Sequence, residues 1–293
     1  MRIKLYLKAM RPHHYIKNLL ILFPIICSGQ LFESRYLLCG IIGVLAFCFL
    51  SSSVYVFNDI NDIPTDSIHC TKKDRPIACG KILTKNAWRF AAVLLSASLI
   101  LNTAACLYIQ SIFPALLFFL YLGLNIGYSL GFKNIPLLDV IILVSGFLIR
   151  TLYGAYLTTI PISNWLYLFI TFTAFYLGFG KRRNELKHST ETNTKNSPKR
   201  YPYSFLDKNM YISMALVIVF YSLWTMDSST VSTYHSNTLV WTVPIIVIIL
   251  MKYSLTIEGN SDGDPVEVFF KDKILMSLVL IYMAVMLIIL YAF

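Results

Sequence analysis

Long apolar stretches alternate with short polar segments along the whole of the 293-residue chain. Nine of these stretches are long enough to cross a bilayer, and they are centred near residues 24, 47, 97, 120, 147, 172, 218, 245 and 283. A membrane-crossing helix needs roughly 20 apolar residues, whereas a strand of a membrane barrel shows about ten residues of alternating polarity. The pattern therefore predicts an all-α integral membrane protein with nine transmembrane helices. Because the longest polar segment covers only residues 181–209, we expect a single domain over residues 1–293.

The basic residues lie almost entirely in alternate polar segments. These segments are 1–17, 58–85, 130–135, 181–209 and 252–273, and together they hold 22 of the 25 Lys and Arg residues. Membrane proteins concentrate Lys and Arg in their cytoplasmic loops. We therefore expect a multi-pass protein of a bacterial inner membrane, with its N-terminus in the cytoplasm and its C-terminus outside. The polar chemistry of the chain should then face the cytoplasm.

The composition agrees with a membrane protein. Hydrophobic residues make up 57% of the chain and charged residues 14%, whereas a soluble domain carries roughly a quarter charged residues. The net charge of +10 would favour nucleic-acid binding in a soluble protein. Here the bases separate apolar stretches, so they favour membrane orientation and anionic ligands, and we expect no nucleic-acid partner. The six cysteines show no spacing typical of a zinc site.

The segment NDINDIPTDSIHCTKKDRPIACGK, residues 58–81, follows the second apolar stretch. If the helix continues through it, Asn58, Asp62 and Asp66 lie four residues apart and share one face, with Asp59 at its edge. Carboxylates at such close range repel one another unless a cation lies between them. Hard oxygen ligands suit Mg²⁺, which commonly binds one or two carboxylates together with substrate phosphates. The segment therefore predicts a magnesium site, and the alternative is a solvated loop whose charges serve solubility and topology.

Two further features of this segment refine the prediction. Lys72, Lys73 and Arg75 follow the acids and can contact the phosphates that a magnesium ion holds. Pro64 lacks a backbone N–H and disfavours helical geometry at the residue before it. We therefore expect the helix to kink or end near Pro64, so that Asp66 reaches the metal from a turn.

The NDxxDxxxD pattern at the end of the second of nine apolar stretches resembles the UbiA superfamily of intramembrane prenyltransferases, and the resemblance covers essentially the whole chain. It implies a helical bundle whose polar cavity opens to the cytoplasm. It also implies that Asn58, Asp62 and Asp66 bind a Mg²⁺–diphosphate group, with Asp59 assisting them.

The polar segment after the sixth stretch departs from the family members that prenylate aromatic rings. Those members carry a second acidic motif, DxxxD, where this chain has GFGKRRNELKH at residues 178–188. Glu185 is the one acid there, beside the bases Lys181, Arg182, Arg183 and Lys187. Arg and Lys side chains bind phosphate groups well. The segment therefore favours a ligand that arrives as a bare phosphate monoester over a second metal-bound diphosphate.

Seven stretches in order resemble one branch of the family, the decaprenyl-phosphate phosphoribosyltransferases. They are RPHHYIKN at 11–18, NDINDIPTDSIHCTKKDRPIA at 58–78, GYSLGFKNIPLLDV at 127–140, GFLIRTLYGA at 146–155, GKRRNEL at 180–186, RYPYSFLDK at 200–208 and GDPVEVFFKDKIL at 263–275. The resemblance implies transfer of the phosphoribosyl group from 5-phosphoribosyl 1-diphosphate to a polyprenyl phosphate, with Mg²⁺ as the cofactor and diphosphate as the product. Because the lipid phosphate is already an anion at neutral pH, we expect no general base.

The candidate site residues fall into three sets. The candidate metal ligands are Asn58, Asp62 and Asp66. The candidate catalytic residues are Asp62, Asp66, Lys72 and Lys73. The candidate substrate-binding residues are Lys17, Asp59, Arg75, Tyr128, Lys133, Lys181, Arg182 and Glu185.

Two charged residues lie within or beside the fifth apolar stretch. Charges inside a membrane are rare and are usually paired or functional. Asp139 and Arg150 are eleven residues apart, about 16 Å along a helix, so they cannot bond each other directly. We expect Arg150 to bond a carbonyl or an acid inside the bundle, and Asp139 to face the polar cavity.

Two other functions are compatible with parts of the sequence. A prenyltransferase that uses a prenyl diphosphate and another acceptor would share the first acidic motif, but the single acid in 181–188 argues against it. A transporter often shows repeated halves, but the 58–76 pattern has no second copy in the chain. The acids Asp262, Asp264 and Glu267 could form a second metal site, and the resemblance favours a family-specific loop there instead.

Overall fold

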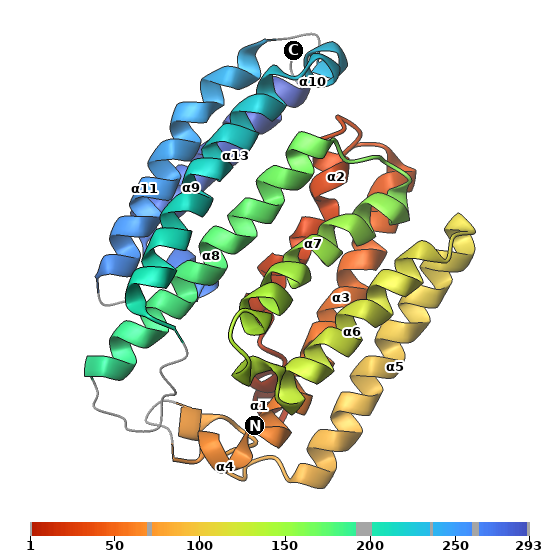
Figure 1. Ribbon diagram of the computed structural model, residues 1–293. Helices are drawn as coiled ribbons and strands as arrows, with labels where there is room; N and C mark the ends of the chain where they lie inside the picture. The colour runs from red at the N-terminus through yellow and green to blue at the C-terminus, as the bar shows by residue number, and fades with distance from the viewer. Residues whose placement is uncertain (1, 69–71, 192–200, 235–236, 260–263, 292–293) are drawn as a thin grey trace. The chain divides into compact units, whose positions relative to one another are not determined.

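The structure is a computed structural model that describes residues 2–68, 72–191, 201–234, 237–259 and 264–291. Every regular element in these ranges is a helix (Figure 1), which confirms the all-α prediction. The chain forms two compact units. The first unit comprises residues 1–26 and 30–161, and the second comprises residues 27–29 and 162–293.

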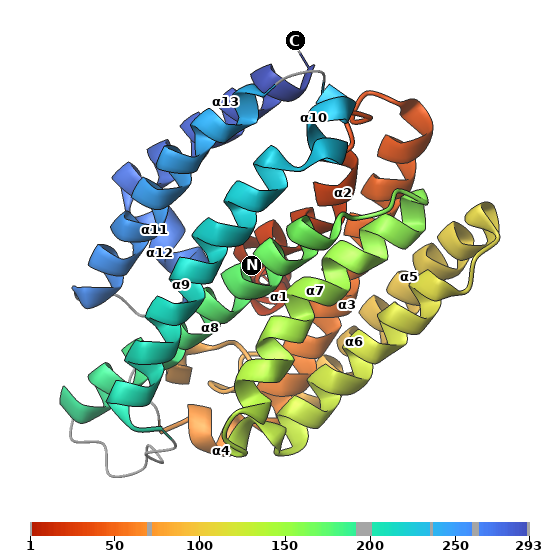
Figure 2. The same cartoon turned by 45° about the horizontal axis from the view of Figure 1, so that its top comes forward.

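The first unit holds the N-terminal helices and four long ones. In chain order its elements are α1 (Arg2–Met10), the 3₁₀ helix η1 (Pro12–Leu22), α2 (Phe23–Ile26), α3 (Ser34–Asn61), α4 (Ile63–Asp66), η2 (Lys72–Asp74), α5 (Thr84–Ile109), α6 (Phe113–Leu130), η3 (Phe132–Asn134) and α7 (Leu138–Thr158). The long helices α3, α5, α6 and α7 run side by side, with α3 in contact with each of the other three (Figure 2).

The regular elements described in the second unit are also helices. Its elements are α8 (Asn164–Glu191), α9 (Tyr203–Met226), α10 (Ser228–Tyr234), η4 (Thr238–Thr242), α11 (Val243–Glu258), α12 (Pro265–Lys271) and α13 (Lys273–Tyr291). Helix α8 packs along α9, and α11 contacts α8, α9 and α13.

Seven segments of the described residues are long and apolar enough to cross a membrane. They are Ser34–Asn61, Thr84–Ile109, Phe113–Leu130, Leu138–Thr158, Tyr203–Met226, Thr238–Glu258 and Lys273–Tyr291. They match seven of the nine predicted stretches. The two other stretches are also helical: the one near residue 24 forms η1 and α2, and the one near residue 172 forms α8. The helix changes from 3₁₀ to α geometry between Leu22 of η1 and Phe23 of α2. Helix α8 carries the basic KRRNELK segment in its last turns.

The 3₁₀ geometry of η1 decides which of its side chains meet α3. In a 3₁₀ helix residues three apart lie on one side, and Tyr15, Asn18 and Ile21 follow that spacing. The Tyr15 hydroxyl lies 2.8 Å from Oγ of Ser52, and the Asn18 amide donates to Oγ of Ser51 at 3.4 Å. Asn18 and Ile21 are fully buried. Helix η1 is therefore fixed against the end of the bundle that carries the acidic motif.

Gly154 lets η1 approach α7 closely. A Cβ atom added to Gly154 would lie 2.0 Å from the carbonyl oxygen of Ile21. Both atoms belong to rigid backbone, so Gly154→Ala should force η1 away from α7 and destabilise the protein by roughly 1–3 kcal/mol. A Cβ added to Gly123 in α6 would meet nothing within 4 Å, so Gly123→Ala is the matched control and should be neutral or slightly stabilising. Thermal unfolding in detergent measures both, and equal midpoints for the two variants would contradict the close approach.

Candidate active site

Helix α3 ends inside the acidic motif. Its last residue is Asn61, Asp62 adopts φ −90° and ψ 5°, and the separate turn α4 begins at Ile63 with Pro64 in its first positions. The carbonyl of Asp62 accepts bonds from the backbone N–H of Asp66 at 2.8 Å and from Oγ1 of Thr65 at 2.9 Å. The predicted break near Pro64 is therefore present, and Asp66 lies on a turn that follows the helix.

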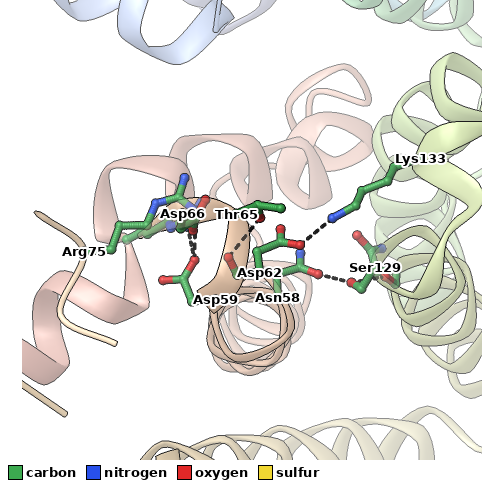
Figure 3. A network of polar contacts seen from close by, with 10 residues as sticks. Asn58, Asp59, Asp62, Thr65, Asp66, Arg75, Ser129 and Lys133 are labelled. Atoms are coloured by element: carbon green, nitrogen blue, oxygen red, sulfur yellow. Dashed lines mark hydrogen bonds and ion pairs between the residues drawn. The ribbon is translucent and has the colours of Figure 1, made fainter. Parts of the chain in front are cut away.

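The side chains of the motif form two groups (Figure 3). The first group contains Asp59 and Asp66, whose side chains are 3% and 5% exposed. Nη1 of Arg75 lies 2.6 Å from Oδ2 of Asp66 and 3.2 Å from Oδ1 of Asp59. Nη2 of Arg11 donates to the same Asp59 oxygen. Arg75 thus bridges the two buried carboxylates, and Arg11 adds a second arginine to Asp59.

The second group contains Asn58 and Asp62, which point away from Asp59 and toward Ser129 and Lys133 (Figure 3). Nζ of Lys133, from η3, lies 2.5 Å from Oδ1 of Asp62. The hydroxyl of Ser129, near the end of α6, donates to the side-chain oxygen of Asn58. The side chains of Asp62 and Lys133 are 30% and 29% exposed. Asp62 is therefore the acid of the motif that a ligand can reach most directly.

Arg11 occupies an unusual backbone position beside the first group. It precedes η1 with φ 55° and ψ 59°, in the left-handed region. Its guanidinium lies over the ring of Tyr55, with its carbon 5.1 Å from the ring centroid. A residue other than glycine in this region costs about 1–3 kcal/mol, and such strain is often found at functional sites. The resemblance of RPHHYIKN makes Arg11 and Lys17 candidates for phosphate binding, with interfacial anchoring as the alternative, and Lys17 is the stronger candidate of the two.

The other predicted residues of the first unit lie on the same elements. Lys72 and Lys73 are exposed on η2, and the carbonyl of Lys72 accepts the backbone N–H of Arg75 at 3.0 Å. Lys17 is half-buried on η1, and Tyr128 is half-buried on α6, one residue before Ser129. Both elements thus also help to form the site, because η1 follows Arg11 and α6 carries Ser129.

The basic segment of α8 is balanced by acids from other helices of the second unit. Arg183 is buried, with Nε 2.7 Å from Oδ1 of Asp207, and its Nη2 pairs with Oε1 of Glu258. Its guanidinium carbon lies 4.9 Å from the ring centroid of Tyr203. Burial alone would lower the pKa of Arg183. The hydrogen bond to Glu258 and the negative charges of Glu258, Tyr203 and Asp207 together outweigh that effect, so the pKa of Arg183 lies above its usual value. The structure thus gives Arg183 a role in holding α8, α9 and α11 together.

The remaining charged residues of this segment also have polar partners. Nζ of Lys181 lies 3.1 Å from Oδ2 of Asp264, and Nη1 of Arg182 lies 2.5 Å from Oε2 of Glu185. Nζ of Lys187 donates to the backbone carbonyl of Glu258 at 2.6 Å. Asp207 and Glu258 were not predicted from the sequence, because they lie 24 and 75 residues from Arg183. Asp207 belongs to the RYPYSFLDK stretch at 200–208, which gave a signal for it, whereas Glu258 lies outside the seven stretches.

Replacing Arg183 should lower stability. Arg183→Ala leaves two carboxylates without their shared partner, and breaking a fully buried pair costs about 3–5 kcal/mol. Asp207 and Glu258 are 31% and 42% exposed, so water can solvate them, and we expect roughly 1–3 kcal/mol. The free energy of unfolding in detergent measures this. Lys208→Ala, at an exposed base of α9, is the matched control and should change it by less than about 0.5 kcal/mol; equal losses in both variants would contradict a structural role for Arg183.

Arg150 and Asp139 are both buried in α7. Arg150 donates to the carbonyl of Gly146 at 2.5 Å, to the side-chain oxygen of Asn18 at 2.8 Å and to the hydroxyl of Tyr121 at 2.8 Å. The prediction that Arg150 bonds a carbonyl inside the bundle is confirmed. Asp139 is 1% exposed and accepts the backbone N–H of Val140. It is therefore packed inside the first unit, whereas the sequence analysis expected it to face a polar cavity.

The donor atoms of the first unit suit a hard divalent cation. Among the residues that the structure describes, no three His, Cys, Asp or Glu side chains are grouped so as to hold a metal ion. Mg²⁺ does not require such a group, because it keeps several waters and commonly takes one or two protein carboxylates together with substrate phosphates. Asn58 and Asp62 supply neighbouring amide and carboxylate oxygens beside Lys133, so these residues fit a metal that arrives with a phosphate ligand.

The chain belongs to the UbiA prenyltransferase family, whose pattern it matches over residues 21–278. Within that family it is similar to proteins named decaprenyl-phosphate phosphoribosyltransferase. The relative from Mycolicibacterium smegmatis is 31% identical over 294 residues, covering 94% of this chain and 88% of the relative. The relative from Corynebacterium glutamicum is 30% identical over 278 residues, covering 94% and 83%. The relative from Mycobacterium tuberculosis H37Rv is 29% identical over 285 residues, covering 94% and 91%.

Solved structures show the same fold. A UbiA homologue from Archaeoglobus fulgidus bound to GPP and Mg²⁺ superposes with a TM-score of 0.71 at 19% identity, covering 98% of both chains. The same homologue bound to DMAPP and Mg²⁺ gives a TM-score of 0.72 at 18% identity, also covering 98% of both chains.

Proposed function

We propose that this protein is a Mg²⁺-dependent transferase that moves the 5-phosphoribosyl group of 5-phosphoribosyl 1-diphosphate to a polyprenyl phosphate of the decaprenyl type and releases diphosphate. Relatives named for this activity, similar to the chain over 94% of its length, support the assignment. The observation that favours this activity over the prenyltransferase alternative is the basic segment of the second unit. This segment, residues 181–187, forms ion pairs with Glu185 in the same helix and with Asp207, Glu258 and Asp264 elsewhere in the unit, and it offers no DxxxD pair for a second metal-bound diphosphate.

The donor is assigned to the first unit. Asn58, Asp62 and Asp66 would hold Mg²⁺, which when bound neutralises the diphosphate and stabilises the negative charge that develops as it leaves. Lys72 and Lys73 are exposed beside the acids and approach the same phosphate oxygens. The bond from the anomeric carbon to the diphosphate oxygen breaks, and the positive charge that develops on the sugar lies beside these acids.

Five further residues of the first unit complete the donor assignment. Asp59 positions Arg75 for the diphosphate through their ion pair. Lys133 is placed for the diphosphate by its ion pair with Asp62. Tyr128 and Lys17, half-buried on α6 and η1, border the phosphoribosyl group.

The acceptor is assigned to the second unit. Lys181 and Arg182 would bind the lipid phosphate, and Glu185 would hold Arg182 in place through their ion pair. An oxygen of the lipid phosphate forms the new bond to the anomeric carbon. Because that oxygen carries negative charge at neutral pH, no side chain needs to remove a proton from it.

We also place the protein across a bacterial inner membrane with nine crossings, a cytoplasm-facing polar cavity, the N-terminus inside and the C-terminus outside. The distribution of Lys and Arg supports this orientation. In a cysteine-free background, a single cysteine at position 208 should react with an impermeant maleimide from the cytoplasmic side, and one at position 237 from the opposite side. Labelling of both positions from one side would contradict the orientation.

The direct test of the function is chemical. Purified protein is incubated with Mg²⁺, labelled 5-phosphoribosyl 1-diphosphate and polyprenyl phosphates of several lengths, and the lipid fraction is analysed by mass spectrometry. We expect a lipid product whose mass exceeds that of the polyprenyl phosphate by one phosphoribosyl group. Consumption of a prenyl diphosphate with no phosphoribosyl lipid would favour the prenyltransferase alternative.

A further inference from the structure

Three bases of the first unit contact the carboxylates of the acidic motif, and two of them contact carboxylates that are assigned to the metal. Nη1 of Arg75 contacts Oδ2 of Asp66 and Oδ1 of Asp59, and Lys133 contacts Oδ1 of Asp62. Arg11 supplies a third base, through its bond to Asp59. Three acids and three bases therefore balance their charges within one network.

The bases of the first group lie outside the acids. The side chains of Arg11 and Arg75 are 20% and 26% exposed, whereas those of Asp59 and Asp66 are 3% and 5% exposed. An ion that approaches Asp66 from solvent therefore meets Arg75 first. Asp62, at 30% exposure, is reached more directly, although Lys133 contacts it.

We propose that the bases and the metal exchange partners when the donor binds. Arg75 and Lys133 leave the oxygens of Asp66 and Asp62 for oxygens of the diphosphate, and the metal takes the carboxylate oxygens that they leave. Arg11 stays on Asp59 and neutralises it, which keeps this buried carboxylate out of the metal's ligand set. The inference rests on the proposed function only in requiring a metal-bound diphosphate at this site.

Electrostatics gives the exchange a direction. A divalent ion alone must displace a cation from each carboxylate and leave that cation beside itself, where the two repel. A metal that arrives with a diphosphate brings oxygens to which the displaced bases can bond. The metal and the diphosphate therefore bind cooperatively, and each raises the affinity of the site for the other by the same factor.

The strained backbone of Arg11 agrees with its separate role. Its left-handed φ of 55° and its position over Tyr55 orient the guanidinium toward Asp59 from the start of η1. Arg75, by contrast, is attached to the loop after η2. Arg75 can thus move without displacing a long helix, while Arg11 directly precedes η1, which is anchored by its buried residues Asn18 and Ile21.

Metal binding without turnover tests the exchange. Binding of Mn²⁺ alone is followed by the electron paramagnetic resonance signal of the free ion, and retention of labelled inorganic diphosphate with Mg²⁺ is followed by equilibrium dialysis. Arg75→Ala should bind Mn²⁺ alone about ten- to a hundredfold more tightly than the unmodified protein, and should retain diphosphate more weakly by a similar factor. Lys133→Ala should change both affinities in the same directions, because it frees Asp62.

Lys81→Ala is the matched control. It removes an exposed base from the same loop without freeing a carboxylate of the network, so both affinities should stay within about twofold of the unmodified protein. The exchange is overturned if Arg75→Ala and Lys133→Ala bind Mn²⁺ no more tightly than Lys81→Ala. It is also overturned if they bind Mn²⁺ more tightly but retain diphosphate unchanged, because the bases would then only shield the acids.

The outcome is independent of the test of transfer. Inorganic diphosphate is common to phosphoribosyl and prenyl donors, so the opposite shifts of the two affinities would support the exchange even if no phosphoribosyl lipid formed. Transfer with no such shifts would support the proposed function and remove the exchange.

Discussion

Asp62→Asn should lower the rate of phosphoribosyl transfer about a hundredfold or more, because it removes one negative charge from the metal-binding group where the leaving charge develops. The fold should tolerate this change. The Asp62–Lys133 pair is about 30% exposed on each side, and exposed ion pairs contribute only about 0–1 kcal/mol to stability. Initial rates with saturating substrates and thermal unfolding of the same samples measure the two effects. A variant that keeps full activity when Mg²⁺ is chelated would contradict the metal assignment.

Two companion variants separate a metal ligand from a structural acid. Asp74→Asn removes an equally charged but exposed carboxylate from η2, so its activity should stay within about twofold. Asp66→Asn should lower both activity and stability, because it breaks the pair between the buried Asp66 and Arg75. The stability loss should reach up to about 3 kcal/mol, since Arg75 is partly exposed. Equal stability of the Asp62 and Asp66 variants would contradict the division of the motif into an exposed and a buried group.

The sequence predicted the motif and its break, but not the grouping of its acids. Pro64 carries a local signal, because its missing N–H and its ring act on neighbouring backbone. Asp59 and Asp66 come together around Arg75 because of the path that the chain takes after Asp62. At Asp62 the backbone angles φ −90° and ψ 5° end the regular helix. The i,i+4 argument therefore holds for Asn58 and Asp62 and fails for Asp66, which follows the break.

The partners of these acids were harder to predict because they come from distant parts of the chain. Lys133 and Ser129 each lie 71 residues from the acid-motif residue that they contact. Lys133 was selected through the resemblance, and Ser129 was not selected at all. Arg150 was easier, because a guanidinium inside an apolar helix must bond some oxygen nearby, and the carbonyl of Gly146 lies one turn away.

Mutations in the basic segment 181–187 and in the lysines after the acidic motif should weaken the binding of different substrates. Arg182→Ala should lower the apparent affinity for the lipid substrate about ten- to a hundredfold, because one charged hydrogen bond is worth roughly 1.5–3 kcal/mol. The apparent affinity for the diphosphate donor should stay nearly unchanged. The side chain of Arg182 is 13% exposed and pairs with Glu185 within the same helix. Lys73→Ala, beside the acidic motif, should weaken the donor instead.

Saturation curves for each substrate, with the other in excess, measure both changes, and Lys208→Ala is the matched control because it removes an exposed base from α9. The lipid affinity of that control should stay within about twofold of the unmodified protein. If Arg182→Ala weakened only the binding of the donor, the segment 181–187 and the lysines after the acidic motif would have been assigned to the wrong substrates. If it weakened the binding of neither substrate, the lipid phosphate would be bound elsewhere.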